Sequence, residues 1–134
     1  MGHAVLGILH GELAVALFAL LVDARRSHEG PVVLMLHGFP DTLHSWQGQL
    51  DAFAAAGYRA VAVAMRGYEP GSQPADGDFA LEALAGDVSA WIDQLGAGQV
   101  HLVGHDWGAA IAGVASALAP GCLPSCSIDT WVRP

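Results

Sequence analysis

Three short apolar runs, each followed by a helical pattern, constrain the fold of this chain most strongly. The runs cover residues 32–36, 60–65 and 100–103. Because they are continuously apolar and do not alternate with polar residues, they are typical of strands buried on both faces of a parallel sheet. The alternation of strand and helix predicts an α/β fold, a parallel sheet flanked by helices. A chain of 134 residues has room for one such domain.

The helical patterns have recognisable ends. The first helix is expected to start at Asp41 or Thr42, either of which is a competent N-cap, and to stop before Gly57. The second ends at Gly96 and repeats apolar residues at helical spacing, namely Leu81, Leu84, Val88, Ile92 and Leu95. The third covers residues 109–118 and is apolar nearly all round, which indicates a helix buried against the sheet.

The two ends of the chain carry weaker signals. Residues 1–30 are compatible with a hairpin or a short helix, and we expect the hairpin. The apolar stretch 13–22 is too short to span a bilayer and has no basic residues before it, so we expect a cytoplasmic protein that does not bind membranes. Cys122 and Cys126 are the only cysteines and have no histidine nearby, so they are expected to be ordinary thiols.

Charge and motif searches exclude several function classes. The formal net charge of −8 argues against nucleic-acid binding, which needs a basic face. No G-x-G-x-x-G follows a strand, and no G-x-x-x-x-G-K-[ST] is present, so a nucleotide cofactor is not expected. The seven histidines do not show a metal-ligand spacing. We therefore predict a site that uses neither a metal nor a cofactor.

The segment Gly104-His105-Asp106-Trp107-Gly108 follows the third apolar run directly. Its two glycines stand two positions from the aspartate, which is the spacing of a nucleophile elbow, a strained turn from strand to helix. The start of the following helix would keep the Asp106 carboxylate ionised. The simpler alternative is that Asp106 only N-caps that helix.

A second motif, His37-Gly38-Phe39-Pro40, follows the first apolar run. In a parallel sheet both motifs leave the same carboxyl edge, where such sheets bind ligands. The simpler reading makes His37 a hydrogen-bonded turn residue and Phe39-Pro40 a rigid loop with a cis bond. The pair of motifs favours a binding or catalytic site over either simple reading taken alone.

Three segments, HGFPDTLHSW, MRGYEPGS and HLVGHDWGAAIA, occur in an order and spacing that resemble the N-terminal half of an α/β-hydrolase of the epoxide hydrolase group. The resemblance covers residues 31–119. It implies that Asp106 is a nucleophile that forms an ester with an epoxide carbon, and that water then hydrolyses the ester. It also implies an oxyanion hole made by the backbone N–H groups of Phe39 and Trp107. The residues that would shape this site are His37, Gly38, Pro40, Gly104, His105 and Gly108.

The resemblance also separates related activities. Esterases carry serine at the elbow, whereas an aspartate suits displacement at an sp³ carbon, so the substrate is expected to be a small epoxide or an organohalide. Haloalkane dehalogenases have asparagine where this chain has Phe39, which favours the epoxide; haloacetate dehalogenases share an HGFP-like loop and remain an alternative. Arg66, Gly67 and Tyr68 resemble the loop after the family's next strand, where Arg66 is expected to brace the loop.

The chain also departs from the family pattern. The family's general base is a histidine that follows the nucleophile, and no histidine follows Asp106. The lid with its two tyrosines and the C-terminal part of the fold are not found either. We therefore expect residues 1–30 to be a poorly matched N-terminal segment, 31–119 the hydrolase half-domain and 120–134 a divergent tail.

These departures predict a truncated hydrolase that forms an ester without turnover. In the family the three matched strands lie side by side, with the first between the other two. We expect both edges of this slab to be bare and open to self-association. The alternative class of function is a non-catalytic fragment that acts as an interaction module through those edges.

Overall fold

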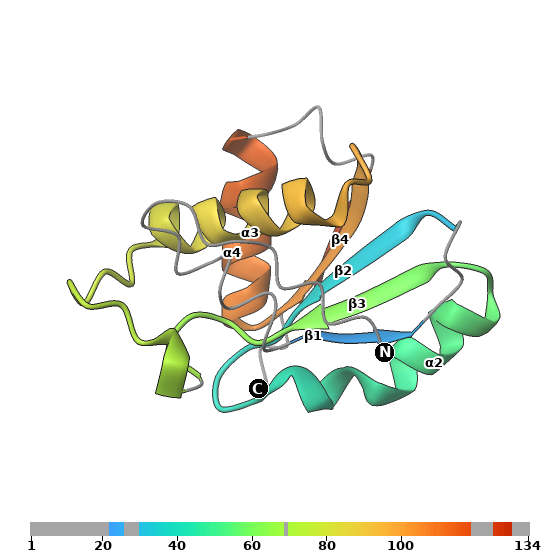
Figure 1. Ribbon diagram of the computed structural model, residues 1–134, viewed down its shortest axis with the longest axis horizontal. Helices are drawn as coiled ribbons and strands as arrows, with labels where there is room; N and C mark the ends of the chain where they lie inside the picture. Colours follow the sequence, from blue (N-terminus) through green and yellow to red (C-terminus); the bar gives the residue numbers. More distant parts are fainter. Residues whose placement is uncertain (1–21, 26–29, 69, 119–124, 130–134) are drawn as a thin grey trace.

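The computed structural model describes residues 22–25, 30–68, 70–118 and 125–129; the side chains of 22–25 and 125–129 are not described. A mixed sheet forms its centre (Figure 1). Its strands are β1 (Val22–Arg25), β2 (Val32–Leu36), β3 (Arg59–Val63), β4 (Val100–His105) and β5 (Ser125–Asp129). The helices are η1 (Leu43–Trp46), α2 (Gln47–Ala55), η2 (Pro70–Ser72), α3 (Leu81–Leu95) and α4 (Trp107–Leu118).

The strand order in the sheet is β1-β3-β2-β4-β5. Strands β3, β2, β4 and β5 run parallel, and β1 pairs antiparallel with β3. The predicted position of the first apolar run between the other two is confirmed. The expectation that both edges of this three-strand slab are bare is wrong, because β1 pairs with β3 and β5 pairs with β4. Strand β1 lies in the poorly matched N-terminal segment 1–30, and β5 lies in the divergent tail 120–134.

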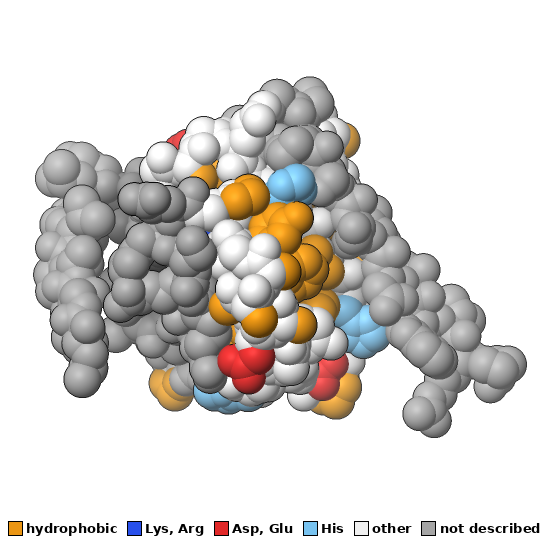
Figure 2. Space-filling view, turned by 90° about the vertical axis from the view of Figure 1, so that its right-hand side faces the viewer, with side chains coloured by type: hydrophobic (Ala, Val, Ile, Leu, Met, Phe, Trp, Pro, Cys, Tyr) orange, Lys and Arg blue, Asp and Glu red, His pale blue; other side chains and the backbone are white. Residues whose placement is uncertain are grey.

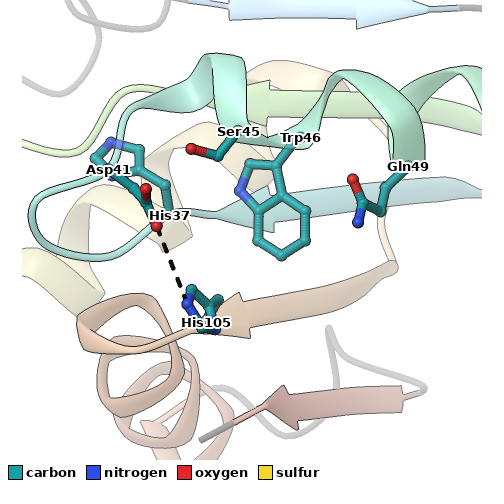
Figure 3. A pocket seen from close by; sticks show the side chains of 6 residues that line it. All are labelled: His37, Asp41, Ser45, Trp46, Gln49 and His105. Carbon is teal, nitrogen blue, oxygen red and sulfur yellow. Dashed lines mark ion pairs between the residues drawn. The ribbon is translucent and has the colours of Figure 1, made fainter. Parts of the chain in front are cut away.

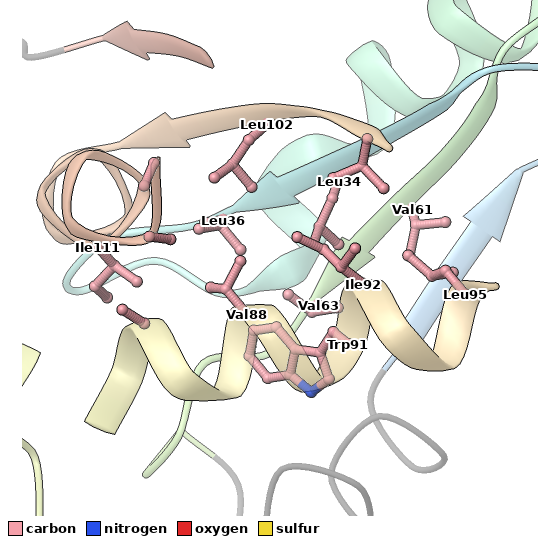
Figure 4. Close-up of a cluster of buried hydrophobic side chains, with 14 of the residues drawn as sticks. Leu34, Leu36, Val61, Val63, Val88, Trp91, Ile92, Leu95, Leu102 and Ile111 are labelled. Carbon is pink, nitrogen blue, oxygen red and sulfur yellow. The ribbon is translucent and has the colours of Figure 1, made fainter. Parts of the chain in front are cut away.

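Helices cover both faces of the sheet. Figure 4 shows the larger core, where Trp91 and Ile92 of α3 and Ile111 of α4 pack on Leu34 and Leu36 of β2. A smaller core on the opposite face joins β2 and β3 to η1 and α2. Strands β2 and β3 are buried on both faces, as the apolar runs predict. A sheet that is parallel except for the edge strand β1, covered by helices on both faces, is therefore the observed arrangement.

Strand β4 departs from this pattern, because buried and half-buried residues alternate along it. His101, Val103 and His105 occupy the half-buried positions. The helix on that face, α2, lies mainly over β3 and β1. This uneven cover leaves one side of β4 partly open beside the carboxyl edge of the sheet.

The helix boundaries differ slightly from those expected. The first helical pattern divides into the 3-10 helix η1 and the α-helix α2, because Thr42 caps a tight first turn in which its Oγ1 accepts the His44 N–H at 3.3 Å. Helix α3 starts at Leu81 and ends at Gly96, whose φ of 64° provides the left-handed cap that the glycine predicts. Helix α4 begins two residues earlier than expected, immediately after Asp106.

The predicted hairpin in residues 1–30 lies largely outside the described residues, and Cys122 lies wholly outside them. None of the described helices is long and apolar enough to cross a membrane. Figure 2 shows hydrophobic side chains gathered in a band on the face at the right of Figure 1, with acidic and histidine side chains along its margin.

Candidate active site

Asp106 stands between the end of β4 and the start of α4 in a strained backbone conformation. Its φ of 55° places it in the left-handed region, and no other non-glycine residue in the described part of the chain has a positive φ. An ordinary N-cap residue has extended dihedral angles. The Asp106 carbonyl does accept the N–H groups of Ala109 and Ala110, at 3.0 and 3.4 Å. Its side chain also reaches outside the helix, because it accepts the N–H of Phe39 in a distant loop, which simple capping does not require.

The Asp106 carboxylate is held from two directions. The backbone N–H of Phe39, 67 positions away in sequence, donates to Oδ2 at 2.9 Å. The Trp107 N–H also hydrogen-bonds the carboxylate. These bonds, that of Phe39 first, lower the pKa of Asp106 below its ordinary value, and the nearby His105 adds to the effect. The exposed carboxylate is therefore ionised at neutral pH.

Glycines make this close approach sterically allowed. A Cβ on Gly38 would overlap the Cβ of Asp106 and lie 2.7 Å from its Oδ2. A Cβ on Gly104 would meet the backbone of Gly108, and one on Gly108 would meet the carbonyl oxygen of Leu36. The G-x-D-x-G spacing thus lets the β4–α4 turn fold tightly against the end of β2.

The Phe39–Pro40 peptide bond is cis, as the loop sequence suggested. The HGFP loop leaves β2 here, turns at a hydrogen bond from the Asp41 N–H to the Gly38 carbonyl at 3.0 Å, and runs on into η1. The two loops that meet at Asp106 are therefore the ones that carry the two sequence motifs.

An apolar cleft of about 210 Å³ is bordered by Phe39 and Trp107, the two residues whose N–H groups hold Asp106. We use this name for the space lined by His37, Phe39, Met65, Arg66, Tyr68, Phe79, Leu84, Trp107 and Ile111. Phe39 and Trp107, whose N–H groups hold the carboxylate, are 67% and 56% exposed. Burial raises the pKa of Tyr68, and the negative charges of Asp106 and Asp41 add to this effect. The cleft thus has aromatic walls, and one of them, Tyr68, lies within the electrostatic influence of Asp106.

A polar pocket of about 290 Å³ lies between the HGFP loop, the helices η1 and α2, and the end of β4 (Figure 3). It is lined by His37, Asp41, Ser45, Trp46, Gln49 and His105. Oδ2 of Asp41 and Nε2 of His105 are 4.0 Å apart, which is an ion-pair distance when the histidine is protonated. The Trp46 Nε1 is buried and makes no hydrogen bond within the described part of the chain. His37 is the residue that borders both the polar pocket and the apolar cleft.

Arg66 braces the loop after β3, as its position in the sequence suggested. Its guanidinium donates to both carboxylate oxygens of Asp87 on α3 and, at 2.9 Å, to the carbonyl of Asp78. Burial raises the pKa of Asp87 even though Arg66 opposes this shift. The sequence did not identify Asp87 as the partner of Arg66. The available signal was the apolar periodicity of α3, which places Asp87 beside Val88 on the buried side.

Among the described residues, no group of three or more His, Cys, Asp or Glu side chains is arranged to bind a metal. The site offers one ionised carboxylate, two backbone N–H donors and an apolar cleft. This arrangement suits attack by a carboxylate on a carbon of an apolar substrate.

A family model described as the α/β-hydrolase fold matches residues 31–126. The chain belongs to the α/β-hydrolase family. It is 43% identical to epoxide hydrolase B of Mycobacterium tuberculosis over 93 residues, which are 69% of this chain and 26% of that protein. It is 41% identical to an epoxide hydrolase of Caballeronia sordidicola over 110 residues, 81% of this chain and 33% of that protein.

Solved structures agree with this membership. The crystal structure of an epoxide hydrolase from Vigna radiata matches with a TM-score of 0.75 and 39% identity, covering 84% of this chain and 37% of that one. An epoxide hydrolase from an endophytic Streptomyces matches with a TM-score of 0.73 and 39% identity, covering 78% and 31%. This α/β-hydrolase chain thus spans about a quarter to a third of the curated relatives given above.

Proposed function

We propose that this chain carries the nucleophilic part of an epoxide hydrolase site, with Asp106 as the nucleophile. The observation that carries the proposal is the Asp106 carboxylate, ionised and held by the Phe39 and Trp107 N–H groups at a strained elbow. An N-cap aspartate needs neither a left-handed backbone nor a bond to a loop 67 positions away. The similarity to epoxide hydrolases favours an epoxide over an organohalide as substrate.

In the proposed reaction, Oδ1 of Asp106 attacks one epoxide carbon while Oδ2 stays hydrogen-bonded to Phe39. The new C–O bond makes an ester, the ring C–O bond breaks, and its electron pair leaves an alkoxide that takes a proton from water. Release of the ester requires an activated water. Attack of that water would form an oxyanion that the Phe39 and Trp107 N–H groups stabilise. Since no histidine follows Asp106 in residues 1–134, we expect the ester to persist.

The test is to incubate the purified chain with styrene oxide and record its intact mass, followed by peptide mapping. We expect one adduct on the wild type, located at Asp106, and none on an Asp106→Asn variant. An Asp93→Asn variant removes an exposed carboxylate on α3 and is expected to react like the wild type. Adduct formation independent of Asp106 would contradict the proposal.

Two further measurements separate the alternatives. Chloroacetate in place of styrene oxide tests the dehalogenase reading, and faster labelling of Asp106 by chloroacetate would favour it. Steady production of diol that depends on Asp106 would contradict the expected lack of turnover. A folded chain that self-associates and forms no adduct would favour the interaction module.

A further inference from the structure

His37 lies at the carboxyl end of β2 between the two loops that form the site. Its side chain is 1% exposed, so its ring atoms need hydrogen-bond partners within the protein. The Met65 N–H donates to Nε2 at 2.9 Å, and Nδ1 lies 2.9 Å from the Gly38 carbonyl oxygen. Because Nε2 accepts a hydrogen bond, the ring proton of neutral His37 is on Nδ1, which donates to Gly38.

The two hydrogen bonds of the His37 ring join the HGFP loop to the segment that follows β3. Gly38 precedes Phe39, whose N–H holds the Asp106 carboxylate. Met65 ends the segment after β3 and precedes Arg66 and Tyr68, which line the apolar cleft. The His37 ring also packs edge-on against Tyr68, with ring centroids 4.5 Å apart. A single imidazole therefore fixes the distance between the HGFP loop and the wall of the cleft.

We propose that neutral His37 is a positioning residue: by accepting the Met65 N–H and donating to the Gly38 carbonyl, it holds the Phe39 N–H against the Asp106 carboxylate. The role of Asp106 in this statement rests on the proposed function. His37 does not touch the reacting atoms and acts through Phe39.

The proposal has a direct consequence for pH. A protonated ring has N–H groups at both nitrogens and cannot accept the Met65 N–H, so protonation of His37 breaks the bridge between the two loops. Burial lowers the pKa of His37, although Gly38 and Asp41 oppose this shift. Asp41 and His105 line the polar pocket with His37, and Arg66 and Tyr68 line the apolar cleft with it.

The pH dependence of stability has a defined sign. The unfolded chain binds a proton at His37 near the ordinary pKa of 6.5, and the folded chain binds it only at lower pH. The contribution of neutral His37 to stability is therefore fully present above that value and falls as the pH decreases below it. Asp106 titrates below its own ordinary range, so its protonation does not account for a loss near neutral pH.

The test compares His37→Gln, His37→Leu and the wild type. The Gln Oε1 can replace Nε2 as the acceptor for the Met65 N–H but does not titrate, whereas Leu provides no acceptor. His44→Gln changes an exposed histidine in η1 and serves as the matched control. The rate of adduct formation with styrene oxide is measured between about pH 5.5 and about pH 8. Hydrogen exchange of the Phe39 N–H is followed over the same range.

For the wild type and His44→Gln, we expect the rate to fall about tenfold per pH unit once the pH is below the His37 pKa. His37→Gln should react at neutral pH within about threefold of the wild type and without this acid limb. Protection of the Phe39 N–H, which is its exchange rate relative to the intrinsic rate at the same pH, should decrease at low pH in the wild type and not in His37→Gln. His37→Leu should show low protection of this N–H at all pH values.

An acid limb of equal size in His37→Gln would overturn the proposal, because another group would then titrate. Slow Phe39 exchange in a folded His37→Leu would overturn it too. If the wild type forms no adduct at any pH, the proposed function fails, and the exchange experiment still decides the role of His37.

Discussion

Replacing Gly108 with alanine is expected to destabilise the chain by about 3 kcal/mol and to abolish adduct formation at Asp106. The added Cβ would overlap the carbonyl oxygen of Leu36 and lie 2.7 Å from that of His37. Both oxygens are backbone atoms at the end of β2, so neither can move away as a flexible side chain would. Helix α4 must then shift away from the sheet, and the Trp107 N–H and the elbow shift with it.

Gly86→Ala provides the matched control, because nothing lies within 4 Å of a Cβ at this position in α3. Alanine in a helix interior is about 0.5–1 kcal/mol more favourable than glycine, so this variant should be slightly more stable than the wild type. Urea unfolding followed by circular dichroism measures both changes. Equal unfolding midpoints for Gly108→Ala and the wild type would show that α4 is not packed against β2 at this point.

Replacing Asp87 with alanine is expected to cost about 3 kcal/mol of stability, at the low end for a broken buried ion pair. The Asp87 side chain is 3% exposed and that of Arg66 13%, so the guanidinium would lose its main partner without gaining full hydration. The Asp78 carbonyl would remain as an acceptor for Arg66. The loop that carries Tyr68 should then loosen, and adduct formation should slow.

The control for this prediction is Asp93→Ala, which removes an exposed carboxylate from the same helix and should change stability by less than about 0.5 kcal/mol. An Arg66→Met, Asp87→Leu double variant should recover most of the lost stability, because it leaves no unpaired buried charge. If Asp87→Ala melts at the wild-type temperature, the pair does not brace the loop.

The periodicity of the sequence was enough to predict the layers of this fold. Continuous apolar runs mark β2 and β3 because both faces of these strands are covered by helices, and burial requires apolar side chains on both. Gly96 marks the end of α3 because a left-handed cap favours glycine. The elbow was also predictable, since only glycines permit the contacts of Gly104 and Gly108.

The edge strands were not predictable in this way. β1 and β5 have four and five residues, and their place in the sheet depends on pairing with β3 and β4, which are distant in sequence. Short segments such as VDAR and SCSID carry no apolar run of their own. Backbone pairing with a preformed neighbour, and not local pattern, decides that such segments become strands.

By itself, the sequence determined which residues turn, cap and enter the core, because these properties depend on side-chain volume, backbone freedom and apolar periodicity along the chain. It also placed Asp106, Phe39 and His37 at one edge of a sheet. Only the tertiary structure decided that the Phe39 N–H reaches Asp106, that Met65 binds His37 and that Asp87 pairs with Arg66. Each of these contacts joins residues at least 21 positions apart, so its distance is fixed by how the strands and helices pack and not by any local preference of the chain.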